Sequence, residues 1–225
     1  MRLPGLGSVL GGWGDDPLWA TFYDWTVEHP QAGGALWRVG IGSDLGRLYA
    51  AADEIGRQPA GSRILDVPCG GGVALRGLEP GQGVEYVAAD IAQAMLDRTL
   101  HGAQERGVAD QVVTRLADVE ALPFEDDSFD LVVSFTGLHC FPDPARAVVE
   151  MARVLKPGGV LTGSALLNDT GVRYEPMRRL GRVAGLLGPG CTGEQVTSWL
   201  AGSGVPDATL DVSGALGYFR GVKRG

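Results

Sequence analysis

Residues 64–72 read Ile-Leu-Asp-Val-Pro-Cys-Gly-Gly-Gly, a short apolar run that passes directly into three consecutive glycines. The apolar run predicts a buried strand, and the sequence after the glycines is compatible with a helix. Such a turn needs glycine because a side chain would keep the backbone away from a ligand, and the following helix offers unpaired N–H groups to a carboxylate or phosphate. Taken alone, this stretch indicates an edge that binds a nucleotide-like cofactor.

The sequence around this turn alternates between short β-branched runs and helical stretches. Five runs predict strands, at residues 64–67, 84–89, 111–116, 129–135 and 160–166. Helices between successive strands indicate a parallel sheet of an α/β protein. Two later runs, 208–212 and 216–222, are joined by three residues only, and so short a connection requires an antiparallel hairpin.

The sequence predicts the ends of helices at three places. Ser43 is predicted to cap a helix that carries apolar residues at helical spacing before Pro59 and Gly61 end it. Asp143-Pro144 predicts the start of a second helix. Its buried stripe is predicted to be Val148, Val149, Ala152 and Leu155, and Lys156-Pro157-Gly158 its end. Thr192 and Gln195 have the spacing of a capping box at a third helix, with Val196, Trp199 and Leu200 pointing inward.

The bulk composition limits the kind of protein. A chain of 225 residues with 44% hydrophobic residues fits one domain. A formal charge of −8 argues against a nucleic-acid partner, which needs clustered Lys and Arg. Three scattered cysteines give neither a disulfide framework nor a metal site. Without a recognisable signal peptide or a bilayer-spanning apolar run, we expect a cytoplasmic protein with no membrane partner.

Three acidic residues lie at or near the ends of three successive predicted strands. Asp66 lies within the glycine stretch, and Asp90 ends the next strand, where a carboxylate can accept hydrogen bonds from both hydroxyls of a ribose. Asp118 follows the third strand, where it could receive an adenine amino group beside apolar walls. Acids at these places indicate a site for an adenosine.

These motifs give the sequence a marked resemblance to the class I S-adenosylmethionine-dependent methyltransferases, in particular the subgroup that includes ubiquinone and menaquinone biosynthesis methyltransferases. The resemblance covers roughly residues 62–166. The family's D-x-G-x-G-x-G motif reads Asp66-Val67-Pro68-Cys69-Gly70-Gly71-Gly72 here, so that Pro68 replaces a glycine and removes an N–H donor. The other matching stretches are 90–92 with Met95-Leu96, Asp118 with 122–124, 128–132, and 153–159.

The resemblance implies a fold and a division of the chain. The fold would be a Rossmann-like three-layer sandwich with a mostly parallel seven-stranded sheet of order 3-2-1-4-5-7-6, in which strand 7 is antiparallel. Within one domain we expect an N-terminal helical cap (1–60), a cofactor-binding core (61–166), a lid (167–192) and a C-terminal helix and hairpin (193–225). The oligomeric state is not legible in the sequence.

The resemblance also implies S-adenosylmethionine as cofactor, S-adenosylhomocysteine as product and a small, at least partly apolar methyl acceptor. Asp66 would lie near the methionine amino group, Asp90 would hold the ribose, and Asp118 would bind the adenine edge. The remaining residues that it implies for cofactor binding are Pro68, Gly70, Gly72, Ile91, Met95, Val119, Ser134 and Tyr23.

His139 is the histidine that follows the fourth predicted strand, at the edge where open α/β folds place reactive groups. It is a candidate general base toward the acceptor, with a residue that only shapes the pocket as the alternative. Arg173, Arg178, Arg179 and Arg182 are candidates to recognise an acidic acceptor group, or to form a solvated helix face. A nicotinamide-dependent oxidoreductase and a noncatalytic cofactor-binding protein remain alternative functions.

Overall fold

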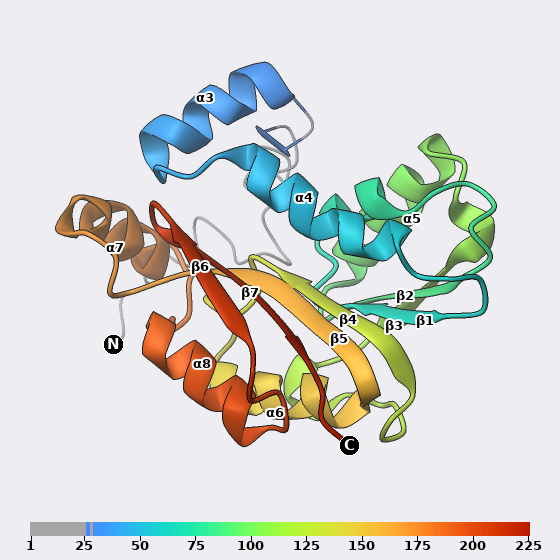
Figure 1. Ribbon diagram of the computed structural model, residues 1–225. Coiled ribbons are helices and arrows are strands. Elements are labelled where there is room, and N and C mark those ends of the chain that lie inside the picture. Colours follow the sequence, from blue (N-terminus) through green and yellow to red (C-terminus); the bar gives the residue numbers. More distant parts are fainter. Residues whose placement is uncertain (1–25, 28) are drawn as a thin grey trace, which may run out of the picture.

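The computed structural model describes residues 26, 27 and 29–225, which fold around one seven-stranded sheet (Figure 1). The strand order is β3-β2-β1-β4-β5-β7-β6. Neighbouring strands from β3 to β5 run parallel, whereas β7 is antiparallel to both β5 and β6, as the sequence predicted. The strands are β1 (Arg63–Asp66), β2 (Glu85–Asp90), β3 (Val112–Leu116), β4 (Phe129–Phe135), β5 (Leu155–Leu166), β6 (Thr209–Ser213) and β7 (Leu216–Val222).

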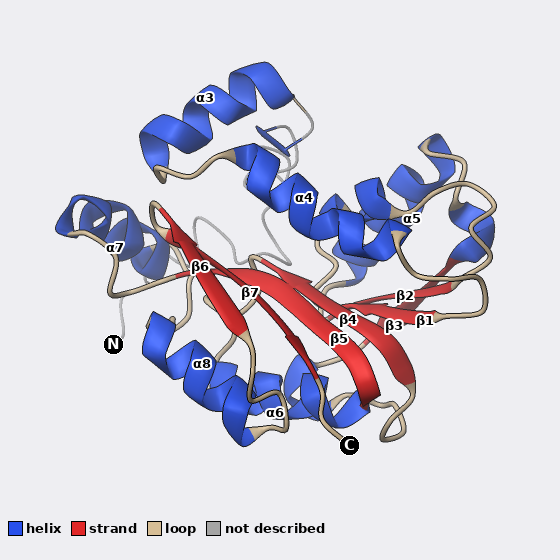
Figure 2. Ribbon diagram, in the orientation of Figure 1, coloured by secondary structure: helices blue, strands red, loops and turns tan. Residues whose placement is uncertain are grey.

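Helices cover both faces of this sheet (Figure 2). The α-helices include α3 (Pro30–Gly40), α4 (Leu45–Gly56), α5 (Gln93–Glu105), α6 (Pro144–Val154), α7 (Glu175–Val183) and α8 (Gly193–Gly202). Short 3₁₀ helices in the described part of the chain join them to the sheet: η1 (Val73–Gly77), η2 (Ala109–Gln111), η3 (Val119–Ala121) and η4 (Val172–Tyr174).

Two hydrophobic cores lie on opposite faces of the strands. Ile64 packs in the core beneath α4 and α5, whereas its neighbour Leu65 packs in the core beneath α6 and α8. Leu131 and Val132 of β4 divide in the same way. Successive side chains of a strand point to opposite faces, so a sheet covered on both sides needs continuous apolar runs. Because of this requirement, the central strands could be predicted from the sequence.

Three predicted helix details differ from the structure. Asp44, not Ser43, caps α4, accepting a hydrogen bond from the Gly46 N–H at 2.8 Å. Val149 is exposed, and Ala147 and Met151 join the buried side of α6 instead. The segment 156–158 does not end that helix, because β5 already begins at Leu155. The caps at Asp143 and at Thr192 with Gln195 are confirmed.

The joint between α3 and α4 rests on the β6–β7 hairpin. The Ala215 N–H donates to the Ile41 carbonyl at 2.7 Å. Ser43, predicted as a cap, is buried here, with its hydroxyl 3.2 Å from that of Ser213 and 3.1 Å from that of Tyr218. Further along α4, the guanidinium of Arg220 donates to both carboxylate oxygens of Glu54, 166 residues away in sequence. The N-terminal helices are therefore tied to the last strand.

None of the helices in the described part of the chain combines the length and the apolarity that crossing a bilayer requires.

Candidate functional site

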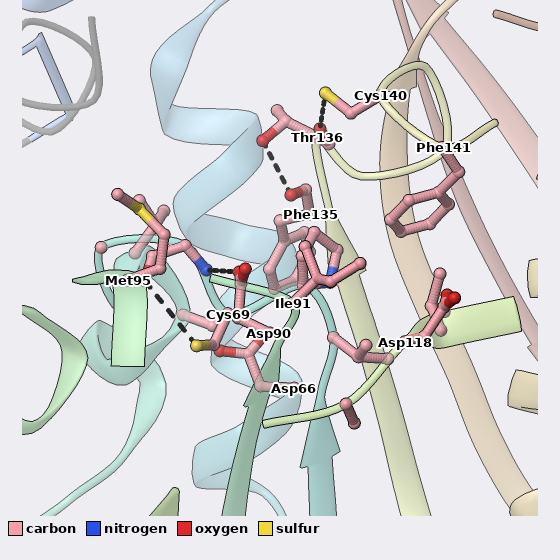
Figure 3. Close-up of a pocket in the computed structure, with 18 of the residues that line it drawn as sticks. Asp66, Cys69, Asp90, Ile91, Met95, Asp118, Phe135, Thr136, Cys140 and Phe141 are labelled. Atoms are coloured by element: carbon pink, nitrogen blue, oxygen red, sulfur yellow. Dashed lines mark hydrogen bonds between the residues drawn. The ribbon is translucent and has the colours of Figure 1, made fainter. Parts of the chain in front are cut away.

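A cavity of about 190 Å³ lies where the carboxyl ends of β1, β2, β3 and β4 meet (Figure 3). The turn after β1 supplies its floor, and the residues after β2 and β3 supply one wall. The loop between β4 and α6 supplies the other wall. Its lining residues are Asp66–Gly71, Val73, Ala74, Asp90, Ile91, Met95, Ala117, Asp118, Val119, Phe135, Thr136 and Cys140–Pro142.

Asp90 ties the glycine turn to the end of β2. One carboxylate oxygen accepts the Gly70 N–H at 3.0 Å, and the other accepts the Ala92 N–H at 3.0 Å. Burial raises the pKa of the Asp90 carboxyl, and these backbone hydrogen bonds oppose that shift. Since each carboxylate oxygen has two lone pairs, both can still accept a further hydrogen bond from a ligand in the cavity.

Asp66 is almost wholly buried, at 1% exposed. The hydroxyl of Tyr86 donates to one of its carboxylate oxygens at 2.7 Å. Burial raises the pKa of Asp66 to about 7, with the charge of Asp90 adding to the rise and the Tyr86 hydrogen bond opposing it. Near neutral pH this carboxyl is therefore poised between its two protonation states, so a cation placed beside it would favour the charged form.

Glycine is required in the turn for two different reasons. Gly70 has φ of 51° and Gly72 has φ of 87°, in the left-handed region that glycine adopts readily. Thr99 on α5 holds the turn by donating its hydroxyl to the Gly70 carbonyl at 2.8 Å. A Cβ on Gly72 would stand 3.3 Å from the Thr99 Cα and 2.9 Å from the Leu75 side chain. Gly72 thus packs against α5 and does not line the cavity.

The residues after this turn, whose sequence was compatible with a helix, form the five-residue 3₁₀ helix η1. Such a short element has a poorer hydrogen-bond geometry than an α-helix and builds little of the dipole that attracts anions. The cavity floor therefore lacks the α-helical N-terminus that dinucleotide sites use for a diphosphate.

The walls of the cavity are apolar. Ile91 is 73% exposed, whereas Met95 and Val119, which also line the cavity, are buried. Asp118 is exposed at the rim, where one carboxylate oxygen accepts the Glu120 N–H at 2.9 Å and caps η3. Of the described residues that line the cavity, three are acids and none is Lys, Arg or His.

Three predicted site residues lie elsewhere. Ser134 is fully buried in β4, and its hydroxyl has no hydrogen-bond partner among the described residues. His139 and Gly72 are likewise absent from the described lining. Tyr23 lies outside the described residues. The other predicted binding residues (Asp66, Pro68, Gly70, Asp90, Ile91, Met95, Asp118 and Val119) are brought together in the cavity.

The environment of His139 does not suit a general base. Its side chain is 8% exposed, and its Nδ1 accepts the Leu166 N–H at 3.0 Å. Burial lowers its pKa to about 4. At neutral pH the ring is therefore uncharged, its lone pair already accepts a hydrogen bond and its proton is on Nε2. The geometry supports the alternative interpretation, a buried histidine that joins the β4–α6 loop to β5.

Sequence reasoning missed the wall formed by the β4–α6 loop. Thr136 has φ of 54°, unusual for a β-branched residue, and its hydroxyl donates to the Phe135 carbonyl at 2.7 Å. Cys140, which the sequence analysis did not single out, lines the cavity together with Phe141. Thr136, Cys140 and Phe141 follow the fourth strand, which was a signal that they could line the site. His139 has the same position in the sequence, but its side chain is buried against β5 and does not line the cavity.

Comparison with known proteins shows that residues 65–162 match a family described as a methyltransferase domain. The chain is 41% identical over 122 residues to a demethylmenaquinone methyltransferase of Clavibacter sepedonicus, a match that covers 54% of this chain and 47% of that protein. It is 36% identical over 102 residues to the 27-O-demethylrifamycin SV methyltransferase of Amycolatopsis mediterranei, with 45% and 38% covered. The chain thus spans less than half the length of these curated relatives.

The fold is also that of known methyltransferases. Phosphoethanolamine N-methyltransferase 2 of Haemonchus contortus, solved with phosphomonomethylethanolamine and S-adenosylhomocysteine, superposes with a TM-score of 0.68 at 18% identity. The superposition covers 95% of this chain and 60% of that one. At this identity the likeness concerns the fold alone.

Proposed function

We propose, from the premise that the core of this chain belongs with the class I methyltransferase domains, that it binds S-adenosylmethionine and passes its methyl group to a small, partly apolar molecule. The observation that carries the proposal is the composition of the cavity, in which three carboxylates and apolar walls surround a glycine turn. S-adenosylmethionine matches this set, because it combines an adenosine, an ammonium group and a positively charged sulfonium.

The residues present fit this cofactor at distinct places. Asp90 would hold the ribose hydroxyls with the lone pairs that its backbone partners leave. Asp66 would balance the ammonium charge, and Asp118 would accept from the adenine amino group. Ile91 and Val119 would cover the two faces of the adenine. When bound, S-adenosylmethionine supplies an electrophilic methyl group, so the protein need not generate one.

The chain's own contribution would be alignment and exclusion of water. Transfer by in-line displacement requires the acceptor atom to be held in line with the bond that breaks, and such positioning can supply on the order of 7–11 kcal/mol. A general base typically contributes about a hundred- to ten-thousand-fold. Because the surroundings of His139 do not suit that role, we assign catalysis here to positioning by Thr136, Cys140 and Phe141 on the β4–α6 loop.

The nicotinamide alternative finds less support in the cavity. A dinucleotide carries a diphosphate, which such folds hold with an α-helix N-terminus or a basic side chain. The turn leads into the 3₁₀ helix η1, and no basic residue is present in the described lining. Three carboxylates would repel the diphosphate.

The test is calorimetric titration of the purified protein with S-adenosylhomocysteine and, separately, with reduced nicotinamide cofactor. We expect binding of the first and none of the second. Incubation with S-adenosylmethionine and a cell extract should then release S-adenosylhomocysteine, which separates an enzyme from a noncatalytic binding protein. Absence of binding at millimolar S-adenosylhomocysteine contradicts the proposal.

A further inference from the structure

The β4–α6 loop, residues 136–143, carries one wall of the cavity (Figure 3), and two residues of β5 hold this loop in place. Its first residue, Thr136, has a left-handed φ of 54°, which is strained for a β-branched side chain. The Thr136 N–H donates to the buried Ser164 hydroxyl at 3.1 Å. Further along the loop, His139 Nδ1 accepts the Leu166 N–H. A strained residue persists only where its surroundings hold it, so the wall depends on these contacts.

The backbone of His139 connects the same loop to the chain that follows α7. The Gly188 N–H donates to the His139 carbonyl at 2.9 Å. A Cβ on Gly188 would stand 2.5 Å from the carbonyl oxygen of Phe141 and 3.2 Å from that of Cys140. Glycine is therefore required here, because two backbones approach too closely for a side chain. The chain after α7 thus lies directly against the main chain of two residues that line the cavity.

Asn168 in turn holds the chain around Gly188. Its side-chain NH₂ group donates to the carbonyl of Pro189, the next residue, at 2.9 Å. Its side-chain oxygen accepts a hydrogen bond from the Arg182 guanidinium of α7 at 2.7 Å. Asn168 therefore ties together the start, the helix and the end of residues 167–192, which we call the β5–α8 segment. Asn168 itself is absent from the described lining of the cavity.

We propose that the β5–α8 segment positions the cavity wall, and that Asn168, Gly188 and His139 are its positioning residues. They act through the wall residues Cys140 and Phe141, because none of the three belongs to the described lining. The ring of His139 accepts a hydrogen bond from β5 and its carbonyl accepts one from the segment, so its role involves no proton transfer. The consequence for catalysis rests on the proposed function, in which this wall aligns the methyl acceptor.

Cys140 provides a probe of this wall that needs no ligand. The chain has three cysteines, of which Cys69 and Cys191 are buried, whereas Cys140 is partly exposed and lines the cavity. Burial raises the pKa of the Cys69 thiol well above its ordinary value and that of Cys191 to about 12. Because a thiol reacts as the thiolate, an alkylating reagent should modify Cys140 first. Displacement of the wall should change the labelling of Cys140, whereas unfolding of the chain also exposes Cys69.

The test is the rate at which iodoacetamide labels each cysteine of the full chain, measured by mass spectrometry of the peptides. We expect Asn168→Ala and Gly188→Ala to accelerate the labelling of Cys140 roughly tenfold, since each weakens the contacts that hold the wall. The labelling of Cys69 should not change. Gly202→Ala is the matched control, because a Cβ there meets nothing within 4 Å, and it should be labelled as the original chain is.

Two substitutions of His139 separate its hydrogen bond from its bulk. His139→Asn keeps an oxygen that can accept the Leu166 N–H, and Cys140 should be labelled close to the original rate. His139→Leu fills a similar space without an acceptor and should accelerate labelling as Gly188→Ala does. A residue that only fills space predicts the reverse order, because leucine is closer to histidine in size than asparagine is.

Methyl transfer provides a second readout. With S-adenosylmethionine and a cell extract, Asn168→Ala and Gly188→Ala should release S-adenosylhomocysteine more slowly than the original chain. This rate should fall by a larger factor than the affinity for S-adenosylhomocysteine, because a displaced wall misaligns the acceptor. Equal falls in rate and affinity contradict the consequence for catalysis.

An unchanged labelling rate of Cys140 in both Asn168→Ala and Gly188→Ala overturns the proposal. Equal acceleration at Cys69 also overturns it, because that result shows a general loss of stability. The labelling experiment needs neither cofactor nor acceptor, and the S-adenosylhomocysteine titration of the original chain needs no variant. A failure of the proposed function is therefore distinguishable from a failure of this inference.

Discussion

The ring of Pro68 occupies the space beside Gly137, where a Cβ would stand 2.5 Å from the Pro68 Cδ. The same Cβ would lie 2.8 Å from the Ser134 hydroxyl and 2.9 Å from the Phe141 ring. Pro68 stands where the D-x-G-x-G-x-G motif has its first glycine. The turn after β1 and the loop after β4 are consequently packed against each other at the cavity, and Gly137 is the residue that allows their close approach.

Gly137→Ala should therefore destabilise the protein by about 1–3 kcal/mol, the usual cost of an extra methyl group in a filled interior. It should also weaken S-adenosylhomocysteine binding, because Pro68 and Phe141 both line the cavity. Urea unfolding and calorimetry measure the two effects. Gly202→Ala is the matched control, since a Cβ there meets nothing within 4 Å, and it should leave stability unchanged or slightly raised. Equal stability of the two variants would refute this account.

Asp90→Ala should weaken S-adenosylhomocysteine binding by roughly tenfold or more for each ribose hydrogen bond lost, corresponding to about 1.5–3 kcal/mol apiece. Calorimetry measures the change. Because Asp90 also holds Gly70, a control must loosen the turn without removing the acid. Thr99→Val does so by removing the hydroxyl that donates to the Gly70 carbonyl. A loss as large in Thr99→Val as in Asp90→Ala would show that only the shape of the turn matters.

Cofactor affinity should depend on pH through Asp66. Its raised pKa of about 7 means that binding an ammonium group beside it releases a proton below that pH, so affinity should rise as pH increases through 7. Tyr86→Phe removes the hydrogen bond that lowers this pKa and should move the midpoint to higher pH. Titrations with S-adenosylhomocysteine across pH 6–8 provide the measurement. An affinity independent of pH, or an unmoved midpoint, counts against the assignment.

His139→Ala should leave the shape of the pH–rate profile unchanged, because the ring is not placed to accept a proton from the acceptor. It should instead lower the free energy of unfolding by about 1–3 kcal/mol, since the Leu166 N–H loses its buried partner. Rates across pH 5–8 and urea unfolding test both statements. Loss of a limb of the profile near pH 6.5 would restore the general-base interpretation.

The same histidine gives stability a defined pH dependence. Its folded pKa of about 4 lies below the ordinary value of 6.5, so the unfolded chain takes up the proton first. The contribution of His139 is therefore fully present above pH 6.5 and is lost as pH falls toward 4, up to about 3 kcal/mol. Urea unfolding at several pH values should show this loss in the original chain and a smaller one in His139→Ala. Parallel pH curves for both proteins would contradict it.

Most of the strands could be predicted from the sequence, because a strand in a sheet covered by helices on both faces needs a continuous apolar run. Phe129–Phe135 and Leu216–Val222 match the predicted limits at both ends. Capping was harder to assign, since Ser43 and Asp44 are both good caps and only the hairpin partners Ser213 and Tyr218 determine which is used. Val149 fits the helical period as well as its neighbours, and its exposure depends on where α6 contacts other elements.

The site residues at strand ends could be predicted from the sequence, because the strand fixes where their side chains lie. The site residues on the β4–α6 loop could not, because the conformation of the loop determines which side chains reach the cavity. The strand-end acids Asp66, Asp90 and Asp118 reach the cavity because parallel strands end at one edge. Whether His139 or Cys140 points inward depends on the β4–α6 loop, in which the left-handed Thr136 changes the chain direction. No periodicity predicts that turn, so the sequence could not tell which of these two neighbours lines the cavity.

The packing of the α3–α4 joint on the β6–β7 hairpin has a consequence for folding during synthesis on the ribosome. During synthesis, every described residue that lines the cavity emerges before residue 143, whereas Ser213, Ala215 and Arg220 lie further along the chain and emerge later. A ribosome-bound chain can thus hold every described residue of the cavity lining while α3 and α4 still lack the hairpin on which their joint rests. Removing the β6–β7 hairpin would therefore take away the support of the α3–α4 joint, although the two segments lie far apart in sequence.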